Sequence, residues 1–549
     1  MKRGISVFAA AGLFLVPAIQ SFAASKSDSL CFHLKVYDEA GLLRSWYQPN
    51  VDGAAFSHVT RLATGFLRDK CPREPKTDKP LYYLFCEFPP PSTSKEFYKG
   101  TAARHTLPHN PACVFAGLTQ SLAVDYRVFY GDDSVLELVR GCLDHMIENG
   151  TTPTDWPWAG CPYASSDPGK TVYAGGSQWQ ESGRGDGLHV IEPDKVGEMG
   201  VAYLQFYEIT GESRYLNAAL ACADALAKNI REGDAQNSPW PYRVNAETGK
   251  IREAYCSNVL SPVMLFDELL RIKDFMDLPG TRFTEYQKAR DAAWKWLFSK
   301  SGPMKTACWK SYFEDTPIDS LNANRVQITP LEVARYIIQH PEYDPYYKQN
   351  VPALINWCES VFGTDGTLGY NAQCEQLICY QPMGSHTARY ASVCALWYEL
   401  SGDGYYKAEA LQNFNWATYC CDIDGVVSVG PRWLGAWFSD GYGDYIKHFF
   451  DGMAAVPEWA PAGENHLLRS TSVVQSIHYS DGKIRYRTFL PASRQVLKLT
   501  RKPHRISVDG IVLSQVNNKE QPGWYWTPCG QDGVLYINHS TGREIQISF

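Results

Sequence analysis

The chain has 549 residues, of which 44% are hydrophobic and 20% are charged, and its formal net charge is −7 at pH 7. This length is enough for one large core and a smaller second domain. The mild excess of acidic residues, with no run of Lys and Arg, argues against nucleic acid as a partner.

The first residues predict a secretory signal peptide. Lys2 and Arg3 precede an apolar run over residues 5–19, and a small-residue segment ends at Ala24. A charged start, a short apolar run and small residues are the three parts of such a peptide. The run is too short for a membrane span, and no later apolar stretch is long enough for one. We therefore expect residues 1–24 to be removed and the mature protein to be secreted or periplasmic, without a membrane span.

A glycine followed by a polar helix start recurs after each of several apolar helical stretches. The copies lie at Gly131, Gly211, Gly280 and Gly402, with a degenerate copy at residues 340–347. Glycine readily adopts the left-handed conformation that ends a helix, and Asp, Ser or Thr caps the helix that follows. Each copy therefore predicts the tip of an antiparallel helical hairpin.

Apolar residues at helical spacing predict a helix on each side of these tips. The predicted pairs are residues 112–130 with 135–147, 201–208 with 216–226, 259–275 with 286–298, and 388–400 with 406–417. The degenerate copy gives a fifth pair, and residues 56–67 with 440–453 give a sixth. One hairpin cannot bury its apolar stripe alone, so we expect the hairpins to form a ring. The chain is thus predicted to be mainly α, with residues 25–462 forming a toroid that carries an N-terminal extension.

The connections at the other end of each hairpin are long and rich in Gly, Pro, Trp and charged residues. They cover about residues 105–110, 155–195, 240–257, 309–327, 363–385 and 422–439. Long loops on a compact helical scaffold often carry function. We therefore expect the functional site at this end of the ring.

From about residue 465 the pattern changes to alternation with a period of two. Val474, Ile477 and Tyr479 lead to Asp481-Gly482, a dipeptide typical of tight β-hairpins. Further strand pairs are expected towards the C-terminus. Residues 463–549 are therefore predicted to form a small β-sandwich domain.

The sixteen cysteines do not predict a metal site. Several lie at apolar helical positions, where Cys behaves as a small buried hydrophobe, while Cys374 and Cys379 could pair within one loop. No Cys-x-x-Cys pair occurs, which argues against structural zinc. The acidic stretch from Asp186 to Glu198 could hold Ca²⁺ but lacks the alternation of an EF-hand. We expect no metal and no other cofactor.

Six antiparallel helix pairs, aromatic-rich loops at one end and a small C-terminal β domain resemble the six-hairpin glycosidase-like superfamily, whose fold is an (α/α)6 toroid. The likeness covers about residues 50–460. It implies an enzyme acting on a carbohydrate, since members include unsaturated glucuronyl hydrolases and other glycoside hydrolases. Relatives with the same toroid include polysaccharide lyases and uronate C5-epimerases. The resemblance is one of architecture, and it identifies no catalytic residue.

Candidate catalytic residues come from the loop over residues 155–195 and from the start of the last helix. Hydrolysis of a glycosidic bond needs one protonated and one ionised carboxyl group. We expect Asp186 and Glu192 as the first choices, followed by Asp194 and Glu198, with Asp440 facing them across the ring. Asp194 and Asp440 could equally serve only as helix-start residues, where carboxylates are stabilised by the helix.

The predicted substrate-binding residues share a position on the loops or at the adjoining helix starts. They are Trp156, Trp179, Glu181, Arg184, His189, Tyr255, Asn258, Arg325, His386, Arg389, Arg432, Trp437 and Tyr442. Trp can stack on sugar rings, and Arg binds carboxylates with two hydrogen bonds. Several Arg residues at one end would suit an anionic sugar such as a uronate.

Three functions remain open at this point. The leading hypothesis is an exported glycoside hydrolase that acts on a uronic-acid-containing glycan by carboxylate acid/base catalysis. A polysaccharide lyase or uronate C5-epimerase would instead use Arg to neutralise a uronate and a Tyr or His, such as Tyr255, Tyr442, His189 or His386, to move a proton. The third is a glycan-binding protein without catalytic activity.

Overall fold

The computed structural model describes residues 29–88, 107–177, 185–276, 278–311, 316, 322–364, 366, 370–431 and 437–549. The predicted signal peptide lies outside the described residues. No helix of the described part is both long and apolar enough to cross a membrane.

Most of the described chain before residue 456 is helical. The helices of the first half are α1 (Ala54–Gly65), η1 (Phe66–Lys70), η2 (Leu81–Tyr83), α3 (Pro111–Leu118), η4 (Thr119–Tyr126), α4 (Arg127–Tyr130), η5 (Asp133–Val135), α5 (Leu136–Asn149), α6 (Pro193–Thr210), α7 (Ser213–Lys228), α8 (Leu260–Arg271) and η7 (Lys273–Phe275). Those of the second half are α9 (Gly280–Leu297), α10 (Pro303–Thr306), α11 (Ile328–Gln339), η9 (Pro341–Tyr343), α12 (Tyr347–Phe362), α13 (Gly384–Ser401), α14 (Gly404–Thr418), α15 (Ser439–Ala455) and η10 (Pro457–Trp459).

These helices form a closed double ring. Within the described residues, α6 packs on α7, α8 on α9, α11 on α12, α13 on α14 and α15 on α1, while the continuous rod α3-η4-α4 packs on α5. The first members of these pairs contact one another in the order α3, α6, α8, α11, α13, α15, and α15 returns to α3. The six predicted hairpins are therefore confirmed, and the domain is an (α/α)6 toroid with these six helices inside.

The hairpin tips follow from glycine geometry at three of the predicted places. Gly131, Gly211 and Gly402 end α4, α6 and α13 with φ of 67°, 76° and 76°, in the left-handed region that favours glycine. The Asp403 side chain then accepts a hydrogen bond from the Tyr405 amide and caps α14. Gly280 differs, because it is the first residue of α9 rather than the end of α8.

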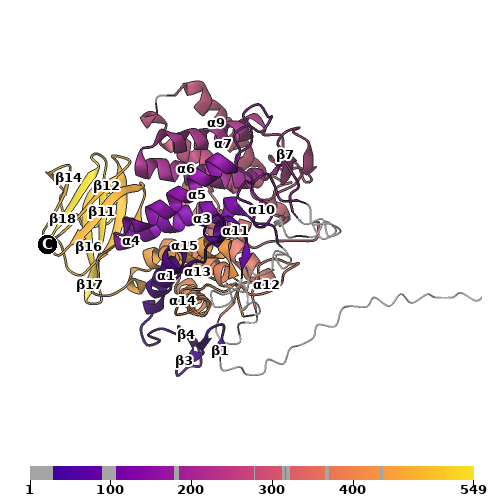
Figure 1. The fold of residues 1–549 in the computed structure, drawn as a ribbon. Helices are drawn as coiled ribbons and strands as arrows, with labels where there is room; N and C mark the ends of the chain where they lie inside the picture. The colour runs from indigo at the N-terminus through magenta and orange to yellow at the C-terminus, as the bar shows by residue number, and fades with distance from the viewer. Residues whose placement is uncertain are drawn as a thin grey trace, which may run out of the picture.

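All six inner helices begin at the same end of the ring, which we call the loop end. The long connections precede α3, α6, α8, α11, α13 and α15, whereas the tips lie at the opposite end. Figure 1 shows the loops around β7 on one side of the helices and the β domain on the other. The prediction that the long loops share one end is therefore confirmed.

The C-terminal domain is a sandwich of two antiparallel sheets. Their strand orders are β10-β13-β17-β16 and β11-β12-β18-β14-β15. The strands are β10 (His466–Ser470), β11 (Val474–Ser480), β12 (Lys483–Thr488), β13 (Ser493–Leu499), β14 (Arg505–Val508), β15 (Ile511–Val512), β16 (Gly523–Cys529), β17 (Asp532–His539) and β18 (Glu544–Ser548). Ser480 pairs with Lys483, which confirms the predicted turn at Asp481-Gly482. Its own apolar core includes Ile484, Leu497 and Ile547.

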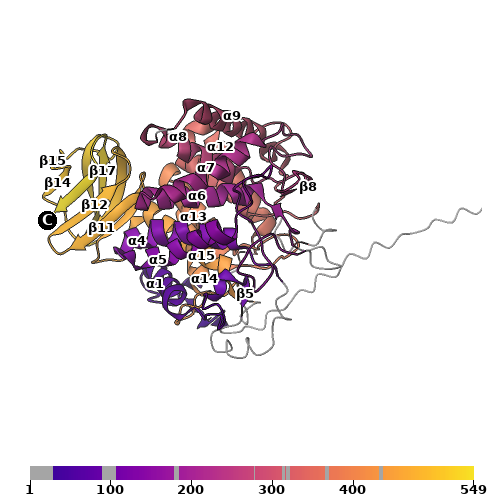
Figure 2. The ribbon, with the colours of Figure 1, turned by 45° about the horizontal axis from the view of Figure 1, so that its top comes forward.

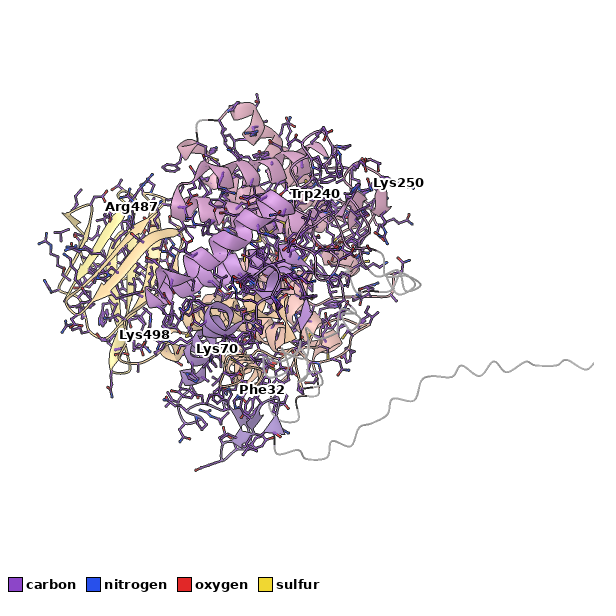
Figure 3. The ribbon with its side chains drawn as sticks, viewed as in Figure 1. Phe32, Lys70, Trp240, Lys250, Arg487 and Lys498 are labelled. Atoms are coloured by element: carbon purple, nitrogen blue, oxygen red, sulfur yellow. The ribbon has the colours of Figure 1, made fainter. Side chains whose placement is uncertain are left out.

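The sandwich lies across the hairpin tips. Arg127 at the end of the first inner rod is fully buried and donates hydrogen bonds to the backbone carbonyls of Val474 and Gln475. Arg469 pairs with Glu399 near the end of α13 at 2.8 Å. In Figure 3, Arg487 and Lys498 mark the sandwich, while Trp240 and Lys250 lie among the loops at the far side.

A short N-terminal segment packs on the end of α14. It consists of the strand pairs β1 (Ser29–Leu30) with β2 (His33–Leu34) and β3 (Val36–Tyr37) with β4 (Leu43–Arg44). The Trp46 indole donates to the Thr418 carbonyl at 2.8 Å, and the Tyr419 hydroxyl donates to the Arg44 carbonyl at 2.8 Å. The segment therefore joins the start of the chain to the last hairpin of the toroid.

Candidate functional site

A small antiparallel sheet joins two of the loops at the loop end. Strand β6 (Val190–Ile191) precedes α6, and the hairpin of β7 (Arg243–Asn245) and β8 (Ile251–Glu253) precedes α8. β6 pairs with β7, and β7 pairs with β8. Figure 2 shows β8 on the side of the toroid away from the sandwich. The sheet fixes the predicted functional loop, residues 155–195, beside the loop before α8.

Asp186 is buried inside this loop pair. Arg243 Nε lies 2.5 Å from Asp186 Oδ1, and neither side chain is accessible to solvent. The Ser165 hydroxyl donates to Asp186 Oδ2 at 2.5 Å, and Arg252 donates to the Asp186 backbone carbonyl. Both carboxylate oxygens are thus engaged by protein groups, which is the environment of a residue that holds loops together.

Glu192 lies beside the same guanidinium. Its side chain is almost fully buried, and Arg243 Nε is 3.6 Å from Glu192 Oε1. Burial raises the pKa of Glu192 well above its ordinary value, and the neighbouring carboxylates of Asp186 and Asp194 raise it further. Burial and the neighbouring carboxylates thus favour the protonated form of Glu192, while Arg243 opposes them.

Asp194 occupies the first turn of α6. Its Oδ1 accepts a hydrogen bond from the Lys195 amide at 2.9 Å, and its Oδ2 accepts one from Asn258 Nδ2 at 3.2 Å. Burial raises the pKa of Asp194; Lys195 opposes this rise and Glu198 adds to it. Asp194 thus combines a position at the start of a helix with a raised pKa, as expected of a proton donor. Asn258, a predicted substrate-binding residue, is its hydrogen-bond donor.

A second group of charged side chains comes from three inner helices. Arg389 on α13 donates hydrogen bonds to Glu332 on α11 and to Asp444 on α15. Lys447 Nζ lies 3.4 Å from Asp444 Oδ1, and His448 Nε2 lies 3.2 Å from the same oxygen. Because α11, α13 and α15 are consecutive inner helices, these side chains meet on the inner face of the ring.

Glu332 and Asp444 are held ionised by these cations. Burial alone would raise the pKa of Glu332, but Arg335, Lys447 and Arg389 together bring it far below its ordinary value. Asp444 behaves in the same way, with Arg389 and Lys447 outweighing its burial and lowering its pKa. Their side chains are 22% and 18% accessible, so water reaches both.

The same surroundings include Lys195 and Glu198 on α6. Lys195 Nζ lies 2.9 Å from Glu198 Oε2, and the two side chains are 22% and 31% accessible. Cys113 on α3 is close enough to interact electrostatically with both Lys195 and Arg389. We call Lys195, Glu198, Glu332, Arg389, Asp444 and Lys447 the axial cluster.

His386 lies one turn before Arg389 on α13. The imidazole is buried, and its Nδ1 has no hydrogen-bond partner in the described part of the chain. Burial, assisted by the charge of Arg389, lowers the pKa of His386 to about 4. The ring is therefore neutral at physiological pH.

Other predicted residues are occupied by contacts within the protein. The Tyr255 hydroxyl donates to the Cys308 carbonyl at 2.9 Å, and the Tyr442 hydroxyl accepts from the Val427 amide at 3.0 Å. Arg325 donates to the backbone carbonyls of Asn322 and Asn324. These contacts fix Tyr255 and Arg325 within their loops, and they join Tyr442 on α15 to the loop that precedes this helix.

Trp156 and His189 form a separate group nearer the surface. Their ring centroids are 4.8 Å apart, and His189 Nδ1 lies 2.7 Å from Glu247 Oε2. The imidazole side chain is 33% accessible. The structure thus brings two of the predicted sugar-contacting residues together.

Several predicted residues lie outside the described part. These are Trp179, Glu181, Arg184 and Arg432, together with the side chains of Trp437 and Asp440. The backbone places Asp440 as the second residue of α15, at the loop end.

Of the axial cluster, the sequence predicted Glu198 and Arg389 as site residues, and it did not predict Lys195, Glu332, Asp444 or Lys447. The signal was present in α15, where Asp444, Lys447, His448 and Asp451 are spaced by three and four residues and so share one helix face. A charged face on a helix that is otherwise apolar, inside a ring of helices, points to the axis.

No protein-family model and no curated protein matches the sequence. Among solved structures, a D-mannose isomerase aligns with a TM-score of 0.49 and 9% identity, over 72% of this chain and 97% of that one. The cellobiose 2-epimerase from Spirochaeta thermophila aligns with a TM-score of 0.45 and 11% identity, over 64% of this chain and 87% of that one. A family 76 glycoside hydrolase from a bovine Bacteroides thetaiotaomicron strain aligns with a TM-score of 0.42 and 12% identity, over 74% and 78%.

These likenesses concern architecture alone. The helix pairs and the closed ring described above form an (α/α)6 toroid, the architecture that the sequence pattern predicts. Because one toroid can carry unrelated reactions, the function must be argued from the side chains at the loop end.

Proposed function

We propose that the protein is an exported carbohydrate-active enzyme, a glycoside hydrolase whose active site lies at the loop end of the toroid. One observation carries this proposal: carboxyl groups near the starts of the inner helices have pKa values shifted in opposite directions. The pKa of Asp194 is raised, whereas the pKa values of Glu332 and Asp444 are lowered. Such a separation supplies the acid and the base that glycosidic hydrolysis requires.

The proposed roles follow from these protonation states. Asp194 donates its proton to the oxygen of the leaving sugar, so that the glycosidic bond breaks without expelling an alkoxide. Glu332, the more accessible of the two ionised carboxylates, accepts a proton from the attacking water. Asp186 and Glu192 then support the site by fixing the loop around Arg243 and α6. Asp440 retains its proposed place as a further carboxylate at the start of α15.

A uronic-acid-containing glycan remains the proposed substrate class. The side chains of Lys195 and Lys447 are 22% and 24% accessible, so each cation can meet an anionic sugar while keeping its carboxylate neighbour. Arg389 is only 5% accessible and is already shared by two carboxylates. The two lysines are therefore better placed than Arg389 to bind the uronate group.

His386 supports an alternative reaction. A neutral imidazole with an unpartnered nitrogen next to Arg389 suits removal of a proton from the carbon beside a carboxylate. A polysaccharide lyase or a uronate C5-epimerase would use such a base. In that case Asp194 and Glu332 would position charged groups rather than react.

Product analysis separates these reactions. The secreted form is incubated with uronate-bearing oligosaccharides and with neutral ones of the same length, and the products are followed by mass spectrometry and near-ultraviolet absorbance. Hydrolysis adds one water to the summed product mass, elimination creates an absorbing double bond, and epimerisation changes neither. We expect hydrolysis of the uronate-bearing substrates. Saturable binding with intact ligand after long incubation would instead identify a binding protein.

Variants test the assigned roles. Asp194→Asn and Glu332→Gln should each lower kcat by about 10²–10⁴-fold, the usual contribution of a general acid or base. Asp291→Asn, on the outer helix α9 with an exposed side chain, is the matched control and should keep wild-type turnover. Full activity in both site variants, with folding verified by circular dichroism, would refute the assignment. If His386→Asn loses activity while Asp194→Asn and Glu332→Gln keep it, the reaction would instead be that of a lyase or an epimerase.

A further inference from the structure

Two cysteines far apart in sequence meet where the N-terminal segment contacts the toroid. Cys31 Sγ and Cys420 Sγ are 3.6 Å apart, although the residues are separated by 389 positions. Both are reduced thiols in this structure. We infer that Cys31 and Cys420 form a disulfide bond that fastens the N-terminal segment across the end of the last hairpin. The inference is independent of the proposed reaction.

The backbone around both cysteines is already held in register. The His33 imidazole lies 2.8 Å from the Cys421 carbonyl, and the Tyr419 hydroxyl accepts a hydrogen bond from the Val36 amide at 3.0 Å. Cys31 has φ of 48° in the turn between β1 and β2. These contacts hold the two thiols next to each other, so only a small movement is needed for the sulfurs to bond.

Cys420 and Cys421 are equally buried, and the direction of each sulfur favours Cys420 over Cys421 as the partner of Cys31. Cys420 is completely buried, and its sulfur faces Cys31, whereas the Cys421 thiol contacts the backbone carbonyls of Val59 and Asp422. The Cys421 contact with Asp422 is 3.6 Å. The adjacent cysteines therefore point to different neighbours, and the linkage is specific to Cys420.

The bond requires an oxidant, which we identify as a small-molecule or protein disulfide reached by thiol–disulfide exchange. The thiolate of one cysteine attacks the donor disulfide and forms a mixed disulfide, releasing one donor thiol. The second cysteine then attacks the mixed disulfide and releases the other donor thiol. Two cysteine thiols are oxidised, one donor disulfide is reduced to two thiols, and both protons pass to the released donor thiolates.

The linkage would act on the loop before α15. The Ser428 amide donates to the Cys420 carbonyl at 2.8 Å, and Cys421 pairs with Val427, so Cys420 lies at the base of this loop. The Gly384 amide donates to the Val429 carbonyl at 2.8 Å, which joins the loop to the start of α13. The bond therefore anchors the connection that leads to Asp440.

Peptide mapping tests the inference on the full chain. The protein is equilibrated with reduced and oxidised glutathione, remaining thiols are blocked with N-ethylmaleimide, and trypsin digestion follows without reductant. Tryptic peptides over residues 27–35 and 408–432 should be recovered as one linked species. Fragmentation between Cys420 and Cys421 should assign the bond to Cys420. Recovery of Cys31 and Cys420 as blocked thiols, or Cys31 bonded to another cysteine, would overturn the inference.

Matched variants provide a second readout. Cys421→Ser should keep the linked species, and Cys420→Ser should lose it. Reduction should lower the Tm of the wild type and of Cys421→Ser by about 2 °C or more, because the bond restricts the unfolded chain. Reduction should leave the Tm of Cys31→Ser unchanged. If reduction lowers the Tm of Cys31→Ser as much as that of the wild type, the decrease comes from another disulfide. The peptide mapping uses the wild-type protein and therefore does not depend on whether a variant folds.

Discussion

The guanidinium of Arg243 and the carboxylate of Asp186 lie 2.5 Å apart, and solvent reaches neither side chain. One partner comes from the loop before α6 and the other from β7, so the ion pair ties two of the loops together. A charge in such a place is costly unless it is paired. The pair therefore adds a buried ionic link to the pairing of β6 with β7 that already joins these loops.

Removal of one partner should be severely destabilising. Asp186→Ala leaves the Arg243 charge buried without its nearest counter-ion, and we expect a loss of about 3–5 kcal/mol in the free energy of unfolding. Chemical denaturation followed by tryptophan fluorescence measures this change. Glu247→Ala, at the exposed ion pair with His189, should change stability by less than about 1 kcal/mol. Equal effects of the two substitutions would contradict the structural role of Asp186.

Arg389 should control the pH dependence of turnover. Its guanidinium contacts both Glu332 and Asp444, a geometry that the single amine of Lys cannot reproduce. In Arg389→Lys the pKa values of both carboxylates should rise, so each is protonated at a higher pH. The acidic limb of the kcat/KM profile should then move to higher pH. Arg290→Lys, at the peripheral pair with Asp267, is the control and should leave that limb in place.

His109 should make the fold sensitive to acid. Solvent does not reach its imidazole, neither ring nitrogen has a hydrogen-bond partner in the described part of the chain, and burial lowers its pKa to about 3. The unfolded chain binds a proton below its ordinary pKa of 6.5, whereas the folded chain does not until the pH nears 3. The contribution of His109 to the free energy of unfolding is therefore fully present above pH 6.5. It decreases as the pH drops, by at most about 1.4 kcal/mol per pH unit.

The comparison with His109→Phe isolates this effect. Phe has a similar shape and no proton to bind, so the variant should lose less stability than the wild type between neutral pH and pH 4. Urea unfolding at a series of pH values measures the difference. Parallel stability curves for the two proteins would show that His109 is not responsible.

Arg127 should fasten the β-sandwich to the toroid. Besides its bonds to the sandwich, Arg127 Nε donates to the Ala123 carbonyl at 2.9 Å, and all of these contacts are lost in Arg127→Met. Leaving buried carbonyls without donors should cost about 1–3 kcal/mol. Limited proteolysis should then cut between the two domains sooner than in the wild type. Arg140→Met, which removes the half-exposed pair with Glu212, should keep the wild-type cleavage rate.

The ring could be predicted from the sequence because its determinants are local. Gly131, Gly211 and Gly402 adopt at low cost the left-handed conformation that ends a helix, and the apolar spacing on either side can be recognised within one helix. The period-two pattern around Asp481-Gly482 is local in the same way. At Gly280 the same signal marks the start of a helix, since Pro279 before it already fixes the backbone turn.

The candidate site was less accessible to such reasoning because its contacts are long-range. In the sequence, Asp186 resembles the acidic residues of exposed loops. The structure shows that it is buried because it pairs with Arg243, 57 positions later. Likewise Glu332, on a predicted inner helix, becomes a site residue only when Arg389 reaches it from the next hairpin. Residue type and spacing predicted that the long loops share one end of the ring, while the partners of each charge could be found only from the fold.

The position of the β-sandwich limits how a ligand can use the toroid. The sandwich is docked on the hairpin tips through Arg127, Arg469 and the strands next to them, so the far side of the ring is occupied by protein. Under the proposed function, a substrate would therefore approach the axial cluster from the loop end. We expect such an enzyme to act on a chain end, a side branch or a short oligomer rather than on a polymer threaded through the ring.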